Sequence, residues 1–211
     1  ISAPIRLSIK VYGTPAHSGT TPMDVRHDAL LTAARIVTAV RDHAAAAAGE
    51  GVVGTVGMLK ASPNAMNVVP GFAEMWIDVR GVNFDSVTQV IERIRESAAQ
   101  YAAAEGVKLE IDVISSAKAV HLDDDLMQAA ADVCEKLAVS HLQMIGGGGH
   151  DSQNIARIVP TCVMHIPCLN GVSHTPEEFA KIEDIMTGID VLTEVMADVA
   201  NDNTESKREG I

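Results

Sequence analysis

Aromatic residues, basic residues and long apolar runs are all scarce in this chain of 211 residues. Aromatic side chains make up only 3%, so the core must be built from Ala, Val, Ile, Leu and Met. Lys and Arg number 16 against 28 Asp and Glu, and the net charge of −12 suits neither a phosphate backbone nor an anionic membrane. No apolar run approaches the roughly 20 residues of a membrane span. We therefore expect neither a nucleic acid nor a membrane as partner.

Cysteine is also sparse. The chain has three cysteines, an odd number without C-x-x-C spacing: Cys134, Cys162 and Cys168. This pattern indicates reduced thiols in a cytoplasmic protein, and neither a disulfide framework nor a cysteine zinc site. The chain opens at Ile1 inside a strand-like pattern without a secretory signal, so we expect a fragment or a processed product.

The first part of the chain alternates between strand and helix periodicity. The expected strands are 5–12, 52–59, 72–80 and 108–114, and the expected helices are 24–48, with Asp24 as its N-cap, and 85–104. This β-α-β-β-α-β order predicts a ferredoxin-like α+β domain over residues 1–115, with a four-stranded sheet and two helices on one of its faces.

A thinner α/β part is expected over residues 116–200. The pattern predicts helices at 123–139, 151–158 and 183–200, a short apolar strand at 143–145, and a buried strand at 161–166 that contains His165. Residues 201–211 are expected to be a frayed tail. Because this part is too small to make a complete domain, we expect it to pack against something outside the chain.

Three polar residues of the first part could carry chemistry. His17 lies in a loop between a strand and a helix, where its ring could polarise a carbonyl or simply form a local hydrogen bond. Asn67 and Arg80 are expected to end adjacent strands of a hairpin and to converge there. A guanidinium beside an amide is suited to binding a carboxylate, although Arg80 could instead pair with Asp78.

The second part offers a glycine run and two histidine motifs. Gly146–Gly149 leaves the backbone open to a ligand, or is only a flexible turn, and it matches neither the Rossmann fingerprint nor the P-loop. His174 follows the expected buried strand and could bind zinc, but zinc needs three or four protein ligands. His121-Leu122-Asp123 looks like a metal pair but is expected to lie at a helix start, with the acidic residues Asp123 to Asp125 as its cap.

Together, five motifs resemble the M20-type zinc amidohydrolases, and more narrowly their N-carbamoyl-L-amino acid hydrolase and allantoate amidohydrolase branch. In chain order the motifs are G-x-x-A-H-S-G-T-T-P-M-x-x-R-x-D-A-L at 13–30, P-N-A-x-N-V-V-P-G at 63–71, D-V-R at 78–80, G-x-G-H-D at 147–151 and G-V-S-H-T-P-x-E at 171–178.

This resemblance implies a homodimer whose catalytic domain holds two zinc ions, or manganese, and whose ferredoxin-like lid makes the dimer contact. It also implies roles by position. His17 would reach into the partner's active site and stabilise the oxyanion, while Asn67 and Arg80 would bind the substrate carboxylate. Gly148 and Gly149 would line the substrate pocket, and His174 would be the last zinc ligand.

The family's other zinc ligands and its general-base Glu come from a segment ahead of the lid, and this sequence contains no such segment. The resemblance therefore implies the C-terminal portion of an amidohydrolase, inactive alone, that acts on N-carbamoyl-L-amino acids, allantoate, ureidoglycine or β-ureidopropionate. The alternative is a catalytically inactive dimerisation or binding module.

Overall fold

The structure, a computed structural model, describes residues 1–205, and these form two compact units. Unit 1 comprises residues 1–120 and 145–149, and unit 2 comprises 121–144 and the chain from 150 onwards. Part of the expected frayed tail, 201–211, lies outside the described residues, whereas the chain is helical through residue 205. Unit 1 contains the whole segment predicted to be ferredoxin-like.

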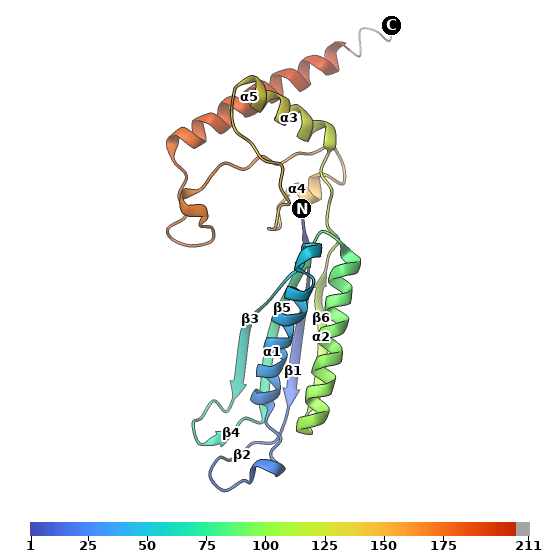
Figure 1. Ribbon diagram of the computed structural model, residues 1–211, viewed down its shortest axis with the longest axis vertical. Helices are drawn as coiled ribbons and strands as arrows, with labels where there is room; N and C mark the ends of the chain where they lie inside the picture. The colour runs from blue at the N-terminus through green and yellow to red at the C-terminus, as the bar shows by residue number, and fades with distance from the viewer. Residues whose placement is uncertain (206–211) are drawn as a thin grey trace. The chain divides into compact units, whose positions relative to one another are not determined.

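Unit 1 is built on one four-stranded antiparallel sheet with the strand order β3-β5-β1-β6. Figure 1 shows its two helices running along the sheet. The elements are β1 (Ala3–Tyr12), α1 (Ala29–Ala46), β3 (Val53–Ser62), β5 (Phe72–Gly81), α2 (Phe84–Glu105) and β6 (Lys108–Ser116). This order and topology confirm the predicted ferredoxin-like fold.

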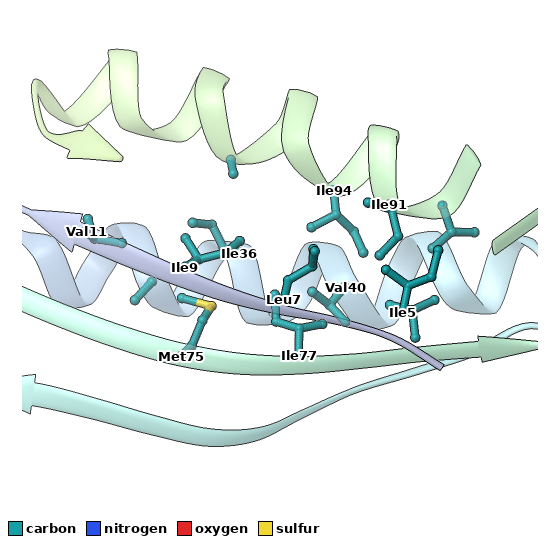
Figure 2. Close-up of a cluster of buried hydrophobic side chains, with 14 of the residues drawn as sticks. Ile5, Leu7, Ile9, Val11, Ile36, Val40, Met75, Ile77, Ile91 and Ile94 are labelled. Carbon is teal, nitrogen blue, oxygen red and sulfur yellow. The ribbon is translucent and has the colours of Figure 1, made fainter. Parts of the chain in front are cut away.

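The core of unit 1 lies between the sheet and the two helices and is aliphatic. Alternate residues of β5 are buried, as the period of a half-covered strand requires. Figure 2 shows Leu7 and Ile9 of β1 facing Ile36 of α1 and Ile94 of α2. All four side chains are fully buried. Because so few aromatic residues exist, close packing of branched aliphatic side chains supplies the hydrophobic stabilisation.

Helix α1 begins later than expected. Asp24 lies in a separate 3-10 turn, Met23–Val25, and the backbone is extended at Arg26. Asp28 is the N-cap, because its carboxylate accepts hydrogen bonds from the amides of Leu30 and Leu31 at 2.9 and 3.0 Å. The prediction of Asp24 as the cap was therefore wrong, since a second Asp four residues later takes that place.

Unit 2 is mainly helical in the described residues. Its elements are α3 (Asp124–Lys136), α4 (Ser152–Ile155) and α5 (Ile182–Glu205), and α3 packs on α5 through a small cluster of Val133, Cys134 and Val191. Asp123 caps α3, as predicted, by accepting a hydrogen bond from the Leu126 amide at 2.9 Å.

The two strands predicted within residues 116–200 are not formed. Residues 143–145 and 161–166 have no strand structure, and His165 is exposed instead of buried. A strand requires a neighbour to pair its backbone groups, and the described part of unit 2 offers none. Among the described helices, none is long and apolar enough to cross a membrane.

Truncation of Ile9 should destabilise unit 1 strongly, since its side chain is fully buried. We expect Ile9→Ala to lower the free energy of unfolding by about 2–5 kcal/mol. The control Ile114→Ala, at a β6 side chain that is 54% exposed, should lower it by less than about 1 kcal/mol. Urea unfolding followed by fluorescence of Trp76 on β5 measures both, and equal losses would contradict the burial argument.

Candidate functional site

The two-stranded hairpin that carries His17 lies at one end of the unit 1 sheet (Figure 1). Strand β2 (Ala16–His17) pairs with β4 (Val68–Val69), with His17 opposite Val68. The Ser18 amide donates to the Asn67 carbonyl at 3.0 Å. His17 and Asn67, two of the predicted site residues, are therefore brought together, and both side chains are exposed.

Two motif glycines are needed to build this end of unit 1. Gly13 donates its amide to the Gly71 carbonyl at 2.8 Å. A Cβ on Gly13 would lie 2.1 Å from the His27 carbonyl oxygen, and one on Gly71 would lie 2.7 Å from the Pro15 nitrogen. No side chain can be added at either position without moving the backbone. Gly13 and Gly71 are therefore needed because His27 and Pro15 pass so close to them.

Arg80 lies near the end of β5 and is held by three hydrogen bonds. Its Nε and Nη2 donate to the two carboxylate oxygens of Asp78, each at 2.7 Å. Its Nη1 donates to the Gly147 carbonyl at 3.2 Å. Asp78 also accepts a hydrogen bond from Arg6 Nε at 2.9 Å. The hydrogen bond from Arg80 and that from Arg6 lower the pKa of Asp78 despite its partial burial.

The glycine run lies beside Arg80. The Ser2 amide donates to the Gly146 carbonyl at 2.8 Å, and the Ser2 hydroxyl donates to the Gly147 carbonyl at 2.9 Å. Gly148 and Gly149 follow as exposed residues. Sequence reasoning missed Ser2 here, and also Arg6. The signal for Arg6 was available, because strand alternation puts it on the polar face of the sheet together with Asp78.

Asn67 and Arg80 do not converge, so that prediction was wrong. Val68 and Val69 pair with β2 and do not form a simple hairpin turn into β5. Asn67 therefore lies before the start of β5, and Arg80 lies near its end. Arg80 comes eight residues after Phe72, and at about 3.4 Å per residue of an antiparallel strand the two lie about 27 Å apart. In one copy of the chain, the two side chains belong to opposite ends of the sheet.

His174 is an exposed residue in unit 2 with a left-handed backbone, φ 62°. Its amide donates to Glu178 Oε2 at 2.8 Å. Within residues 1–205, no three His, Cys, Asp or Glu side chains are grouped so that they could hold a metal ion. His121 pairs with Asp124 at 2.9 Å beside the start of α3. The described residues alone thus do not fit the predicted two-metal centre.

Comparison with known proteins places these motifs among hydrolases. The profile of peptidase family M20/M25/M40 matches residues 10–198. The ureidoglycolate hydrolase of Arabidopsis thaliana is 35% identical over 96% of this chain and 43% of its own length. The N-carbamoyl-L-amino-acid amidohydrolase of a Pseudomonas species is 30% identical over 92% of this chain and 47% of its own. An allantoate amidohydrolase of Escherichia coli also matches.

Solved structures of amidases are also similar to this chain in fold and sequence. A crystal structure of an amidase of the hydantoinase/carbamoylase family from Burkholderia multivorans superposes with a TM-score of 0.87 at 33% identity. That match covers 92% of this chain and 47% of the amidase. The chain thus spans about half the length of the curated relatives it matches.

The ion pair of Asp78 with Arg80 and Arg6 makes the stability of unit 1 dependent on pH. The pKa of Asp78 is lowered below its ordinary 3.8 in the folded state. A lowered folded-state pKa contributes stability above the unfolded-state pKa, and this stability is lost as the pH falls through the folded-state pKa. Asp78→Asn should therefore destabilise unit 1 at pH 7, with a progressively smaller effect below about pH 4.

Urea unfolding followed by Trp76 fluorescence between pH 3 and pH 7 measures this difference. Asp42→Asn is the matched control, since Asp42 forms an exposed pair with Arg41 and should change stability little at any pH. A loss from Asp78→Asn that stays the same across the pH range would contradict the electrostatic account.

Proposed function

The chain belongs to peptidase family M20/M25/M40, and we propose that it forms the lid and the C-terminal part of the catalytic domain of an amidohydrolase. The substrate class is a small ureido or carbamoyl acid, in which one linear C–N bond is hydrolysed. The named activities of the relatives, on N-carbamoyl-L-amino acids, allantoate and ureidoglycolate, support this class. Such substrates share a carboxylate and an acyl carbon bonded to nitrogen.

The observation that carries the proposal is the geometry of Arg80. A guanidinium has five N–H donors. Asp78 and the Gly147 carbonyl take three of them in the described residues, through Nε, Nη2 and Nη1. One N–H then remains on each terminal nitrogen, and this pair matches the two oxygens of a carboxylate. Arg80 is half-buried and fixed by Asp78, so little side-chain entropy would be lost on binding.

At the other end of the sheet, His17 is proposed to stabilise the oxyanion that develops on the carbonyl oxygen when the carbon is attacked. Its ring is exposed and can be presented to a substrate, with Asn67 beside it. A small acid cannot span the roughly 27 Å between this hairpin and Arg80. A second copy, related by a twofold axis, can bring its own hairpin to the first copy's Arg80. We infer a homodimer with two composite sites.

The β3 edge of the sheet is the better candidate for the dimer contact. Strand β6 carries Lys108, Glu110 and Asp112, and charges on an edge strand discourage pairing with another chain. Strand β3 has one charged residue, Lys60, and it exposes the apolar side chains of Met58 and Leu59. An edge of this kind is open to pairing with its symmetry mate.

Unit 2 is proposed to complete the catalytic domain together with a further segment of the enzyme. Its helix α5 exposes Ile182, Met186, Ile189, Leu192 and Met196, which is unusual for a finished globular domain. Zinc remains a prediction from the resemblance: His174 is one donor, and further ligands would have to come from that segment. On this proposal the isolated chain is inactive. The three free cysteines suit a cytoplasmic location.

A competing reading is a module that dimerises or binds without catalysis. It accounts for the edge strand β3 but leaves the arrangement of Arg80 unexplained. The two readings differ in the complete enzyme, where only the first requires turnover of a carboxylate-bearing ureido substrate and loss of that turnover when the carboxylate is removed from the substrate.

Arg80→Ala in the complete enzyme should raise KM for N-carbamoyl-L-amino acids, allantoate or ureidoglycolate and change kcat little. A hydrogen bond to a charged group is worth about 1.5–3 kcal/mol, which corresponds to an increase of about 10- to 150-fold. Steady-state assays of ammonia release measure both constants. Arg41→Ala, at an exposed site on α1, is the control. An unchanged KM would remove Arg80 from substrate binding.

Leu59→Lys should convert the dimer of this chain into monomers, because pairing at β3 would bury an uncompensated charge. Val113→Lys, at an exposed position on β6, should leave it dimeric. Sedimentation equilibrium at several concentrations gives the masses of all three forms. A monomeric parent chain, or dissociation by Val113→Lys and not by Leu59→Lys, would contradict the proposed contact.

A further inference from the structure

Arg26 is a motif residue of unit 1 to which the proposed function gives no role. It follows the 3-10 turn Met23–Val25 and is partly buried. Its Nε and Nη2 donate to the Thr21 carbonyl at 3.1 and 2.9 Å, and Nη2 also donates to the Ser18 carbonyl at 2.5 Å. One guanidinium therefore ties both ends of the turn that directly follows His17.

The same turn is closed from within by two hydrogen bonds to His17. The Thr21 amide donates to the His17 carbonyl at 3.2 Å. The Gly19 amide donates to the ring nitrogen Nδ1 of His17 at 3.1 Å. The position of the Gly19 amide relative to the imidazole thus depends on a turn whose two ends Arg26 holds.

The bond from Gly19 determines which ring nitrogen of His17 carries the proton. A neutral imidazole has one N–H donor and one nitrogen lone pair. Because Nδ1 accepts the Gly19 hydrogen bond with its lone pair, the proton of the neutral ring must be on Nε2. An oxyanion needs a donor, and this tautomer presents one without prior protonation of the ring.

We propose that Arg26 is a positioning residue that keeps the 17–21 turn closed and so holds His17 as the Nε2–H tautomer. This proposal rests on the proposed function for its catalytic meaning. Without Arg26, two carbonyls lose their donors, the turn opens, and the Gly19 amide no longer fixes Nδ1. Lysine is not an adequate substitute, because a single ammonium lacks the planar fork that spans both carbonyls.

Nuclear magnetic resonance on the full 211-residue chain tests the proposal without any turnover. The chain is labelled with ¹⁵N in histidine and glycine, and spectra are taken about 1.5 pH units above the ordinary imidazole pKa of about 6.5. Long-range ¹H–¹⁵N correlations report the tautomer of His17, and hydrogen exchange reports the Gly19 amide. We expect a single Nε2–H pattern and a protected Gly19 amide in the parent chain.

Arg26→Ala and Arg26→Lys should both shift the His17 nitrogens toward averaged tautomer values and raise Gly19 exchange by about tenfold or more. Arg41→Ala should change neither readout. The signals of His43, which bonds Ser97, verify that unit 1 remains folded. These measurements involve no substrate, so a negative result for Arg26 says nothing about the role of Arg80. In the same way, an unchanged KM in Arg80→Ala says nothing about the positioning of His17 by Arg26.

Three results would overturn the proposal. The first is a proton on Nδ1 of His17 in the parent chain. The second is an unchanged His17 pattern and Gly19 protection in both Arg26 variants. The third is loss of the unit 1 fold in both variants, which would make Arg26 a residue of general stability and not one that positions His17.

Discussion

The ten-residue length of β5 is the constraint on which the rest of the account depends. Its register with β1 sets Phe72 opposite Tyr12 and Arg80 opposite Pro4, so the two ends of the sheet cannot approach each other. The His17 hairpin is built at one end and the Arg80 contacts at the other. With about 27 Å between Phe72 and Arg80, one copy of unit 1 cannot bring His17 and Arg80 to the same small molecule.

The two faces of the unit 1 sheet differ in what they contact. One face packs aliphatic side chains against α1 and α2 and gives a rigid core. The other face carries polar pairs, such as Asp78 with Arg6 and Arg80, which fix these side chains without filling the core. The bidentate hydrogen bond to Asp78 orients Arg80 near the end of the strand. It leaves three of the five N–H donors of Arg80 for other partners, one of which is the Gly147 carbonyl.

Sequence reasoning succeeded where the signal was local and periodic, and it failed where partners decide the outcome. Alternation and helix periodicity were enough to predict the ferredoxin-like order of unit 1. Asp24 and Asp28 are both good caps, and only the extended backbone at Arg26 decides between them. Val68 and Val69 have strand propensity, but their sequence does not reveal that β2 is their partner. Residues 161–166 have the same propensity, but the described part of unit 2 offers no strand with which they could pair.

The most direct test of the composite site is a purified heterodimer of the complete enzyme, in which one subunit carries His17→Ala and the other Arg80→Ala. If each site combines His17 of one subunit with Arg80 of the other, one of the two sites is intact, and kcat/KM, measured with substrate well below the parent KM, should be about half that of the parent dimer. A heterodimer of His17→Ala with the double variant has no intact site and serves as the control. A kcat/KM of the first heterodimer no higher than that of the two variant homodimers would contradict the account.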